Sequence, residues 1–385
     1  MLKLIWHFSH LIVLCGFAAK VGFGSEKQKN YVLFCFSLTL HYLCNMIKVR
    51  LIPYRAELGT IYHRQSKGHQ LVSLDGRYQF FVEEDIDDPD FVVVQGKGLR
   101  QTQMFHVAPQ NTIMLATEPK SVLVYPKRYL RQFGMVCTCQ EGTKHPNVHY
   151  GPAVLPWFVA CTEKEGKCAY TLDYDQLKAA PTPPKEKLIS VITSNKAFTR
   201  GHLDRIHFVE ALKAHFGDRL DVFGRGFRPF DDKWDVLAPY RYHIAIENSS
   251  QRYYWTEKIS DSFLTETYPF YYGCTHLEDY FPQEAFTPID IHDAPRAIAT
   301  IEAALASDRY EAAKAALTEA KRRVLDEYNI FEYVARLCDR LDPNAPRQEV
   351  TLRPCRSSND WHNLYNYTIG HNLFKLKMKL TGNKL

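Results

Sequence analysis

Apolar residues recur at two spacings along most of the chain, the alternation typical of strands and the longer period typical of helices. The clearest succession begins at residues 188–194, a largely β-branched stretch that predicts a strand. An amphipathic helix is predicted over residues 204–216, with Gly217 as its stop, and a second strand over residues 219–223. A strand, a helix and a strand in this order predict a parallel sheet.

The alternation continues into the stretch with the strongest chemical pattern. Residues 242–246 alternate as in a buried strand, which is predicted to end in the polar loop 247–250. Thr256 then offers a hydroxyl cap, so a helix is predicted to begin at Glu257 and Lys258. A helix N-terminus presents unpaired N–H groups and partial positive charge. A lysine in the first turn therefore indicates a phosphate site, with a solvated surface lysine as the alternative.

The region before residue 177 has the same α/β character. Strands are predicted over residues 46–53, 78–82, 91–94 and 111–117. Glu118 follows the last of them. A carboxylate at the exit of a buried strand is well placed to stand over a crevice between domains. A solvated loop glutamate is the alternative interpretation.

Residues 177–187 contain three prolines between charged residues, without apolar periodicity, and are predicted to be a linker. They separate an N-terminal α/β domain, residues 46–176, from a C-terminal domain, residues 188–341, and residues 342–385 are predicted to form a tail. The chain of 385 residues, 45% of them hydrophobic, is long enough to bury two cores.

The first 45 residues hold two apolar runs, residues 4–19 and 31–47. Each run is at or below the length that crosses about 30 Å of hydrocarbon as a helix. A signal peptide, a type II membrane anchor and a translated region ahead of a true start at Met46 are the three interpretations. We favour the last, because a predicted strand opens directly at Met46 and no spacer follows the runs.

The charge and the cysteines exclude some classes of function. A net charge of +5 does not indicate nucleic-acid binding, although it suits an anionic ligand or a peripheral contact with a membrane. The ten cysteines lack the paired spacing and histidine partners of a zinc site, so free or buried thiols in a reducing cytoplasm are predicted. The pair Asp173 and Asp175 has the form of a metal-binding DxD motif, but it lies beside the linker and is interpreted as chance.

Several motifs, in order along the chain, resemble the donor-binding half of glycosyltransferase family 10, the α-1,3/4-fucosyltransferases, in a bacterial-like form. The resemblance rests on Glu247-Asn248-Ser249, Tyr254-Trp255-Thr256-Glu257-Lys258, the run 268–273, the run 279–282, Ser194-Asn195, the run 205–212 and the run 222–226. A weaker match covers residues 112–158 and includes Pro156-Trp157-Phe158.

The resemblance implies an α/β fold of the GT-B type, two Rossmann-like domains facing across a cleft with the acceptor domain first. It also implies an inverting transfer of fucose from GDP-fucose to a hydroxyl of a glycan acceptor, with no metal or other cofactor. Glu118 matches the family's general base, which takes the proton of the acceptor hydroxyl.

The resemblance also assigns donor-binding residues. Arg205, predicted in the first turn of its helix, matches the phosphate-binding arginine and ranks above Arg225, although Arg200 competes with it on physical grounds. Lys258 would also contact the diphosphate, and Glu257 would hold hydroxyls of the ribose or sugar.

Three further residues are assigned to the donor cleft. Glu247 and Asn248 would line it, and Tyr254 would stack on the base or sugar, with packing as its alternative role.

Departures from the family leave the substrate open. Gln251-Arg252 and residues 265–269 differ from the usual pattern. The alternatives are transfer from another GDP- or UDP-sugar, a non-catalytic nucleotide- or glycan-binding protein on the same fold, and an adhesion protein if the leader is genuine. A cytoplasmic location is predicted, with a Golgi-type anchor if the leader is genuine and the source eukaryotic.

Overall fold

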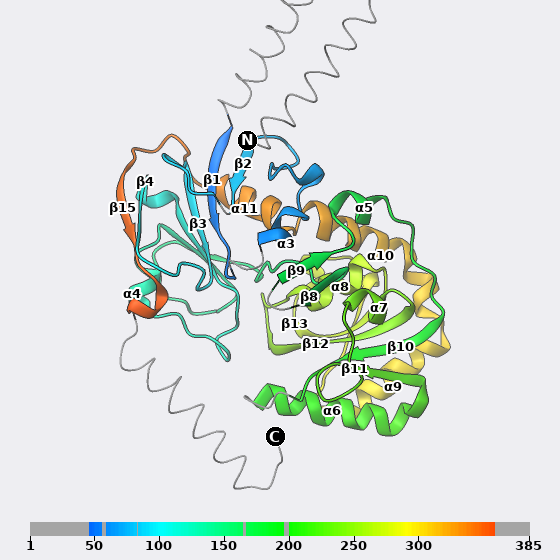
Figure 1. Cartoon of the computed structure of the whole chain (residues 1–385). Coiled ribbons are helices and arrows are strands. Elements are labelled where there is room, and N and C mark those ends of the chain that lie inside the picture. Colours follow the sequence, from blue (N-terminus) through cyan, green and yellow to red (C-terminus); the bar gives the residue numbers. More distant parts are fainter. Residues whose placement is uncertain (1–45, 56–58, 83, 165–166, 196–199, 359–385) are drawn as a thin grey trace, which may run out of the picture.

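The computed structural model describes residues 46–55, 59–82, 84–164, 167–195 and 200–358 (Figure 1). These residues form two parallel sheets, each with helices packed against it, which confirms the predicted α/β fold with two Rossmann-like domains. The predicted leader, residues 1–45, and most of the predicted tail lie outside the described residues. Among the residues that the structure describes, no helix is both long and apolar enough to cross a membrane.

The N-terminal sheet has the order β2-β1-β3-β5-β6-β7, and every neighbouring pair is parallel. Its strands are β1 (Ile47–Ile52), β2 (Tyr78–Phe81), β3 (Phe91–Gln95), β5 (Thr112–Leu115), β6 (Met135–Thr138) and β7 (Val148–Tyr150). Residues along β3 and β5 are buried on both faces, which explains why these strands are continuous apolar runs.

Smaller elements surround this sheet. An antiparallel ribbon joins β4 (Gln103–Val107) to β15 (Gln348–Leu352), and β8 (Cys161–Lys164) forms a hairpin with β9 (Lys167–Tyr170). The short helices are α3 (Gly59–His63), η2 (Lys67–His69), η3 (Pro109–Asn111), α4 (Lys127–Leu130), α5 (Tyr174–Ala179) and η7 (Cys355–Ser358).

The C-terminal sheet has the order β11-β10-β12-β13-β14 and is also parallel throughout. Its strands are β10 (Lys187–Ile192), β11 (Leu220–Phe223), β12 (Tyr240–Gln251), β13 (Tyr268–Cys274) and β14 (Thr287–Pro288). The chain leaves β10 toward β11 on one side and later returns to β12 on the other. The strand order therefore reverses between β10 and β12, and such a switch point opens a crevice at the carboxyl ends of the strands.

Helices cover both faces of this sheet, with α6 below it and α9 and α10 on its outer side in Figure 1. The helical elements are α6 (Arg200–Phe216), η4 (Gly217–Arg219), α7 (Lys233–Leu237), α8 (Glu257–Leu264), η5 (Leu277–Asp279), η6 (Gln283–Ala285), α9 (Ala294–Ala306) and α10 (Arg309–Asp326). Gly217 ends α6 in a left-handed conformation with φ +55°, as its place in the sequence predicted.

The end of the chain returns to the N-terminal domain, and here the predicted domain limits are wrong. Helix α11 (Ile330–Cys338) falls inside the predicted C-terminal domain, residues 188–341, but its apolar residues pack in the core of the N-terminal sheet. Strand β15 falls inside the predicted tail, residues 342–385, yet it pairs with β4. The periodicity of α11 predicts a buried face but not the sheet that this face covers.

Three local boundaries also differ from their predictions. Helix α5 extends into the predicted linker, residues 177–187, because Leu177 is fully buried in the C-terminal core. Helix α6 starts at Arg200, which places Arg205 in its second turn instead of its first. Strand β12 continues past the predicted loop 247–250 to Gln251, across an irregularity after Ile246.

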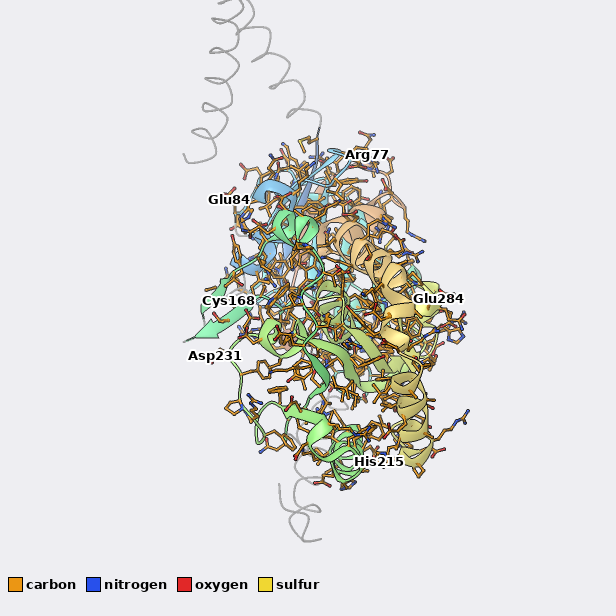
Figure 2. All side chains as sticks on the ribbon, turned by 90° about the vertical axis from the view of Figure 1, so that its right-hand side faces the viewer. Arg77, Glu84, Cys168, His215, Asp231 and Glu284 are labelled. Atoms are coloured by element: carbon orange, nitrogen blue, oxygen red, sulfur yellow. The ribbon has the colours of Figure 1, made fainter. Side chains whose placement is uncertain are left out.

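A view turned by 90° shows the two domains stacked along the length of the molecule (Figure 2). Arg77, at the start of the N-terminal sheet, lies at one end, and His215 of α6 lies at the other. Arg77 is ion-paired with Asp339, directly after α11, at 2.7 Å. This contact helps to fasten the returning segment to the N-terminal domain.

Candidate functional site

A cavity of about 190 Å³ lies at the switch point of the C-terminal sheet. It is lined by Ile192 at the end of β10, Thr193 and Ser194 after it, Arg205 of α6, Lys233 and Leu237 of α7, His243, Ala245 and Ile246 of β12, and Glu257, Lys258 and Asp261 of α8. A larger hollow of about 480 Å³ between α6 and β11 is mainly apolar, and none of its lining residues comes from α8. The smaller cavity is therefore the candidate ligand-binding site, because three cations, Arg205, Lys233 and Lys258, line it at the carboxyl edge of the sheet.

The first turn of α8 is fixed by a buried carboxylate. Thr256 caps the helix by accepting the N–H of Lys258 at 3.4 Å. Glu247 of β12 is fully buried and accepts the backbone N–H of Thr256 at 2.9 Å and its hydroxyl at 2.8 Å. The strand therefore sets the position of the helix start, and a helix start so placed offers N–H groups and positive potential to an anion.

Lys258 lies among carboxylates at this helix start. Its Nζ is 3.2 Å from Glu247 Oε2 and 3.4 Å from Glu257 Oε1. Burial lowers the pKa of Lys258, but these two carboxylates raise it by more. The pKa of Lys258 therefore lies above its ordinary value. Burial raises the pKa of Glu257, but Lys258 and Lys233 lower it more, to about 2. Both groups are therefore charged at any working pH.

Arg205 reaches the same cavity from α6. Its guanidinium is buried and donates to Asn248 Oδ1 at 3.1 Å and to Ser194 Oγ at 3.3 Å. Its buried Nε has no hydrogen-bond partner among the described residues. Burial lowers the pKa of Arg205, against the opposing effect of Glu247. Such an arginine, held on neutral acceptors and not on a paired carboxylate, is suited to a phosphate ligand.

Lys233 is a third cation, and the sequence alone did not predict its role. Its Nζ is 2.7 Å from Asp261 Oδ2 and 3.7 Å from Glu257 Oε1. Burial lowers the pKa of Lys233, but Asp261 and Glu257 outweigh it and raise the pKa. Asp232 caps α7 by accepting the N–H of Trp234 and so fixes the helix that carries Lys233. The sequence signals for this position were weak. They were Asp232 as a possible cap for a five-residue helix and Asp261, four positions after Glu257, as a possible partner for a cation.

His243 contributes a neutral imidazole to the cavity lining. Its Nδ1 is 2.9 Å from Ser190 Oγ, and that hydroxyl donates to the carbonyl of Val236. Burial, with the charge of Lys233, lowers the pKa of His243 to about 3. The hydroxyl proton of Ser190 is donated to the Val236 carbonyl, so His243 Nδ1 must donate its own proton to Ser190 Oγ. In the neutral imidazole Nε2 is then an acceptor.

Glu118 faces this cluster from the N-terminal domain. It follows β5, is half-buried, and its carboxylate makes no hydrogen bond or ion pair within the described part of the chain. Burial raises its pKa to about 7, with Lys258 opposing the rise and Glu257 and Glu247 adding to it. A carboxylate with such a pKa exchanges a proton near neutral pH, as a general base must.

The surfaces around Glu118 and α8 are in direct contact. The ring of Tyr150, at the end of β7, stacks on Tyr253 with centroids 5.4 Å apart. Cys139, Ala153 and Tyr254 form one buried apolar cluster. The two carboxyl edges of the sheets therefore meet, and the cavity and Glu118 belong to one site.

A segment between the domains is held by two buried charges. Asp261 Oδ1 accepts the N–H groups of Phe158 and Val159 at 3.1 and 3.3 Å. Arg64, which is fully buried, donates to the carbonyls of Trp157, Val159, Ala160 and Leu172. Asp261 thus connects Lys233 in the cavity to the chain that joins the domains.

Not every residue assigned from the sequence lies in the cavity. Tyr254 is fully buried in the apolar cluster, so its predicted stacking on a base or sugar is replaced by packing. Glu247 and Asn248 do not line the cavity but contact residues that do or that adjoin it. Glu247 contacts Thr256 and Lys258, and Asn248 accepts a hydrogen bond from Arg205.

Arg225 is exposed and also lies outside the cavity lining.

The DxD-like pair has a local structural role. Asp173 caps α5 in a capping box with Gln176 and lies 2.8 Å from His69 Nε2, and Asp175 accepts the N–H of Gly68. In the described ranges no group of three or more His, Cys, Asp or Glu side chains is arranged to hold a metal ion. The seven cysteines that the structure describes are free thiols, as predicted.

Comparison with known proteins shows which proteins the C-terminal part of the chain resembles. Residues 182–349 match glycosyltransferase family 10 (fucosyltransferase), C-terminal. Human alpha-(1,3)-fucosyltransferase 7 is 30% identical over 176 residues, 44% of this chain and 49% of that protein. The 4-galactosyl-N-acetylglucosaminide 3-alpha-L-fucosyltransferase of Pongo pygmaeus is 28% identical over 120 residues, 30% of this chain and 32% of that protein. The chain spans about half, or less, of the length of these relatives.

A solved alpha1,3-fucosyltransferase structure is similar to this chain with a TM-score of 0.43 and 16% identity, over 70% of this chain and 80% of the other. The fold itself, two parallel sheets joined through α11, is of the predicted GT-B type. Residues 182–349, which include Arg205, Lys233, Glu257 and Lys258 of the cavity, are thus similar to the C-terminal domain of glycosyltransferase family 10, the fucosyltransferases.

Proposed function

We propose that this chain is an inverting glycosyltransferase that transfers fucose from GDP-fucose to a hydroxyl of a glycan acceptor. The observation that carries the proposal is the position of Glu118, with a pKa of about 7, opposite a cavity lined by Arg205, Lys233 and Lys258. The choice of fucose rests on the family of the C-terminal domain and on the names of its relatives.

The three cations form the part of the site that suits a nucleoside diphosphate. Arg205 offers a planar fork of donors, and Lys233 and Lys258 add point charges beside the start of α8. In a partly buried cavity such groups act on the negative charge that develops on the leaving group. Glu257, which is ionised at neutral pH because its pKa is about 2, would accept hydrogen bonds from hydroxyl groups of the ribose or sugar.

The reaction that fits this arrangement is a single displacement. Glu118 takes the proton of the acceptor hydroxyl while the oxygen attacks the anomeric carbon. The bond between that carbon and the diphosphate oxygen breaks, and its electron pair leaves on GDP. Attack from the face opposite the leaving group inverts the anomeric configuration. General base catalysis of this kind contributes about 10²- to 10⁴-fold to the rate.

Fixed cations take the place that a divalent metal has in other transferases, so we propose that the reaction requires no metal ion.

The test uses the full chain with GDP-fucose, other GDP-sugars and UDP-sugars, each with and without EDTA, and a galactosyl-N-acetylglucosaminide acceptor. Transfer from GDP-fucose alone, unchanged by EDTA, is the expected result.

Two outcomes would replace the proposal. Transfer from another nucleotide sugar would keep the mechanism and change the donor. Tight binding of GDP without turnover on any donor would indicate a non-catalytic nucleotide-binding protein.

A further inference from the structure

Two cysteines meet on the hairpin of β8 and β9, outside the lining of the cavity. Strand pairing places Cys161 opposite Tyr170 and offsets it from Cys168 by two residues, so the two cysteines lie diagonally on the same face. Both pack in one apolar cluster of the N-terminal domain, and their side chains are hydrogen-bonded to each other. Neither thiol has a part in the proposed transfer reaction.

Cys168 is the thiol that a reagent reaches first. Figure 2 shows it at the outer edge of the molecule, and its side chain is partly exposed. The other cysteines that the structure describes are buried. Burial raises the pKa of the Cys161 thiol to about 12, with Arg64 opposing the rise, so Cys161 is a weak nucleophile. An oxidant therefore meets Cys168 first, and Cys161 is the thiol in contact with it.

The chain that leads to Cys161 is held by the two carboxylates on either side of Lys233. Four successive N–H groups, those of residues 158–161, point at these carboxylates: Asp261 accepts the first two and Asp232 the last two. Asp261 lies 2.7 Å from Lys233 Nζ, and Asp232 caps the helix that carries this lysine. A displacement of Cys161 is therefore passed on to a cation of the cavity.

Closing a disulfide on this hairpin moves the backbone. The Cα atoms of a diagonal pair are about 7–8 Å apart, and a disulfide needs them within about 7 Å, so the two strands must approach each other. Strand β9 cannot absorb all of this shift, because Thr171, directly after it, donates to the carbonyl of Ala160 at 3.0 Å. Ala160 has a φ of +54°, a conformation that a residue with a side chain adopts only when its surroundings hold it there. The shift therefore reaches the strained segment before Cys161.

We propose that Cys161 and Cys168 are a reversible modification site, a disulfide that hydrogen peroxide closes and a dithiol reductant opens, and that the closed form binds a nucleoside diphosphate more weakly. The coupling to the cavity rests on the proposed function, whereas the disulfide itself does not. Transient disulfides of this kind act as redox sensors in reducing compartments.

The reaction needs peroxide as its single oxidant. The sulfur of Cys168, as a thiolate, attacks one peroxide oxygen, the O–O bond breaks, and a sulfenic acid forms while one water leaves. The sulfur of Cys161 then attacks the sulfenic sulfur, an S–S bond forms, and hydroxide leaves as a second water with the proton of Cys161. Two thiols have lost two electrons and two protons, and one peroxide has become two waters.

The first test maps the bond. The full chain is treated with hydrogen peroxide, the remaining thiols are alkylated, and tryptic peptides are analysed by mass spectrometry. Trypsin cuts after Lys164 and Lys167, so a disulfide between the two cysteines joins two separate peptides. We expect this linked pair after peroxide and its disappearance with dithiothreitol. Finding both cysteines alkylated after peroxide would overturn the proposal.

Calorimetric titration with GDP tests the coupling. The oxidised wild type should bind GDP about tenfold more weakly than the reduced protein and recover with dithiothreitol. Cys168→Ser and Cys168→Ala, at a partly exposed position, should bind GDP equally well with and without peroxide. Cys355→Ser keeps the pair and removes a thiol from a different apolar cluster, so it should respond as the wild type does. Equal affinity of the oxidised and reduced wild type would overturn the coupling.

The proposed function can fail separately. If the reduced wild type binds no GDP, the candidate donor site is wrong, and the peptide map still decides the disulfide. A linked pair in that case would support the modification site and reject its coupling to a diphosphate site.

Discussion

At the scale of single residues, the site places charges where burial changes their chemistry. Glu118 is half-buried, its carboxylate has no hydrogen-bond or ion-pair partner in the described part of the chain, and its pKa rises to about 7. Glu257 is partly buried beside two lysines, and its pKa falls to about 2. Two carboxylates in one site are thus tuned in opposite directions, one to exchange a proton and the other to remain charged.

The raised pKa of Glu118 predicts a cost in stability that depends on pH. Its folded-state pKa of about 7 lies above the unfolded value of 4.5, so the native state binds more protons between these pH values and stability falls as pH rises through them. Glu118→Gln should therefore raise the stability of the chain at pH 8, by about 1–2 kcal/mol after partial screening, and change it little at pH 4. Thermal unfolding at both pH values measures the difference. An equal shift at both would contradict the raised pKa.

Lys233 is predicted to bind the diphosphate as well as to neutralise Asp261. Lys233→Met should weaken GDP binding by about tenfold or more and leave the binding of guanosine unchanged. Calorimetric titration with both ligands measures this.

The single variant leaves Asp261 without its closest cation, so the double variant Lys233→Met/Asp261→Asn is the control. Restored stability together with weak GDP binding would separate the two roles of Lys233. Restored GDP binding in the double variant would show that the lysine is structural only.

At the scale of elements, the start of α8 depends on one hydroxyl. Thr256 caps the helix and donates to the buried carboxylate of Glu247 at 2.8 Å. Thr256→Val keeps the shape but loses the cap and leaves Glu247 with one donor fewer, so we expect a loss of about 2–3 kcal/mol in stability and weaker GDP binding. Thr256→Ser keeps the hydroxyl and should lose under about 1 kcal/mol. Denaturant unfolding of the two variants should differ accordingly, and equal losses would exclude the hydroxyl as the cause.

The elements that sequence predicts well are those with local signals. The cap at Thr256, the strand before it and the stop at Gly217 each depend on neighbours within a few residues, and all three appear in the structure. Lys233 has no such signal, because what brings it to Asp261 is the packing of α7 on α8. The sequence could not decide the role of Tyr254. An aromatic residue beside a loop gives the same pattern whether it contacts a ligand or packs against Cys139 and Ala153, as Tyr254 does.

At the scale of the whole molecule, the chain crosses between its two domains more than once. The predicted division by a single linker missed the return of α11 and β15 to the N-terminal domain. Strands β4 and β15 are more than two hundred residues apart, and the spacing of apolar residues within each strand does not show which strand it pairs with. Two α/β domains were nevertheless predicted, and so was the parallel sheet of the second, because alternating strands and helices allow little else.

The segment at residues 157–160 is predicted to be the joint that holds the domains together. Arg64 is fully buried there and donates to three carbonyls of this segment and to the carbonyl of Leu172. Arg64→Met should cost about 3 kcal/mol or more, because those carbonyls lose their charged donor. Arg77→Met removes an arginine that is half-exposed and ion-paired, and it should cost under about 1 kcal/mol. Similar unfolding midpoints for the two variants would contradict this account of the joint.

The central claim is that Glu118 of one domain and the cationic cavity of the other form one catalytic site. The most direct test measures fucose transfer from GDP-fucose by the full chain and by Glu118→Gln, with the GDP affinity of both proteins measured in parallel. We expect the variant to transfer fucose about 10²-fold more slowly, or slower still, while it binds GDP equally well. Transfer at the wild-type rate by the variant would show that Glu118 is not the base and that the two domains do not share the chemistry.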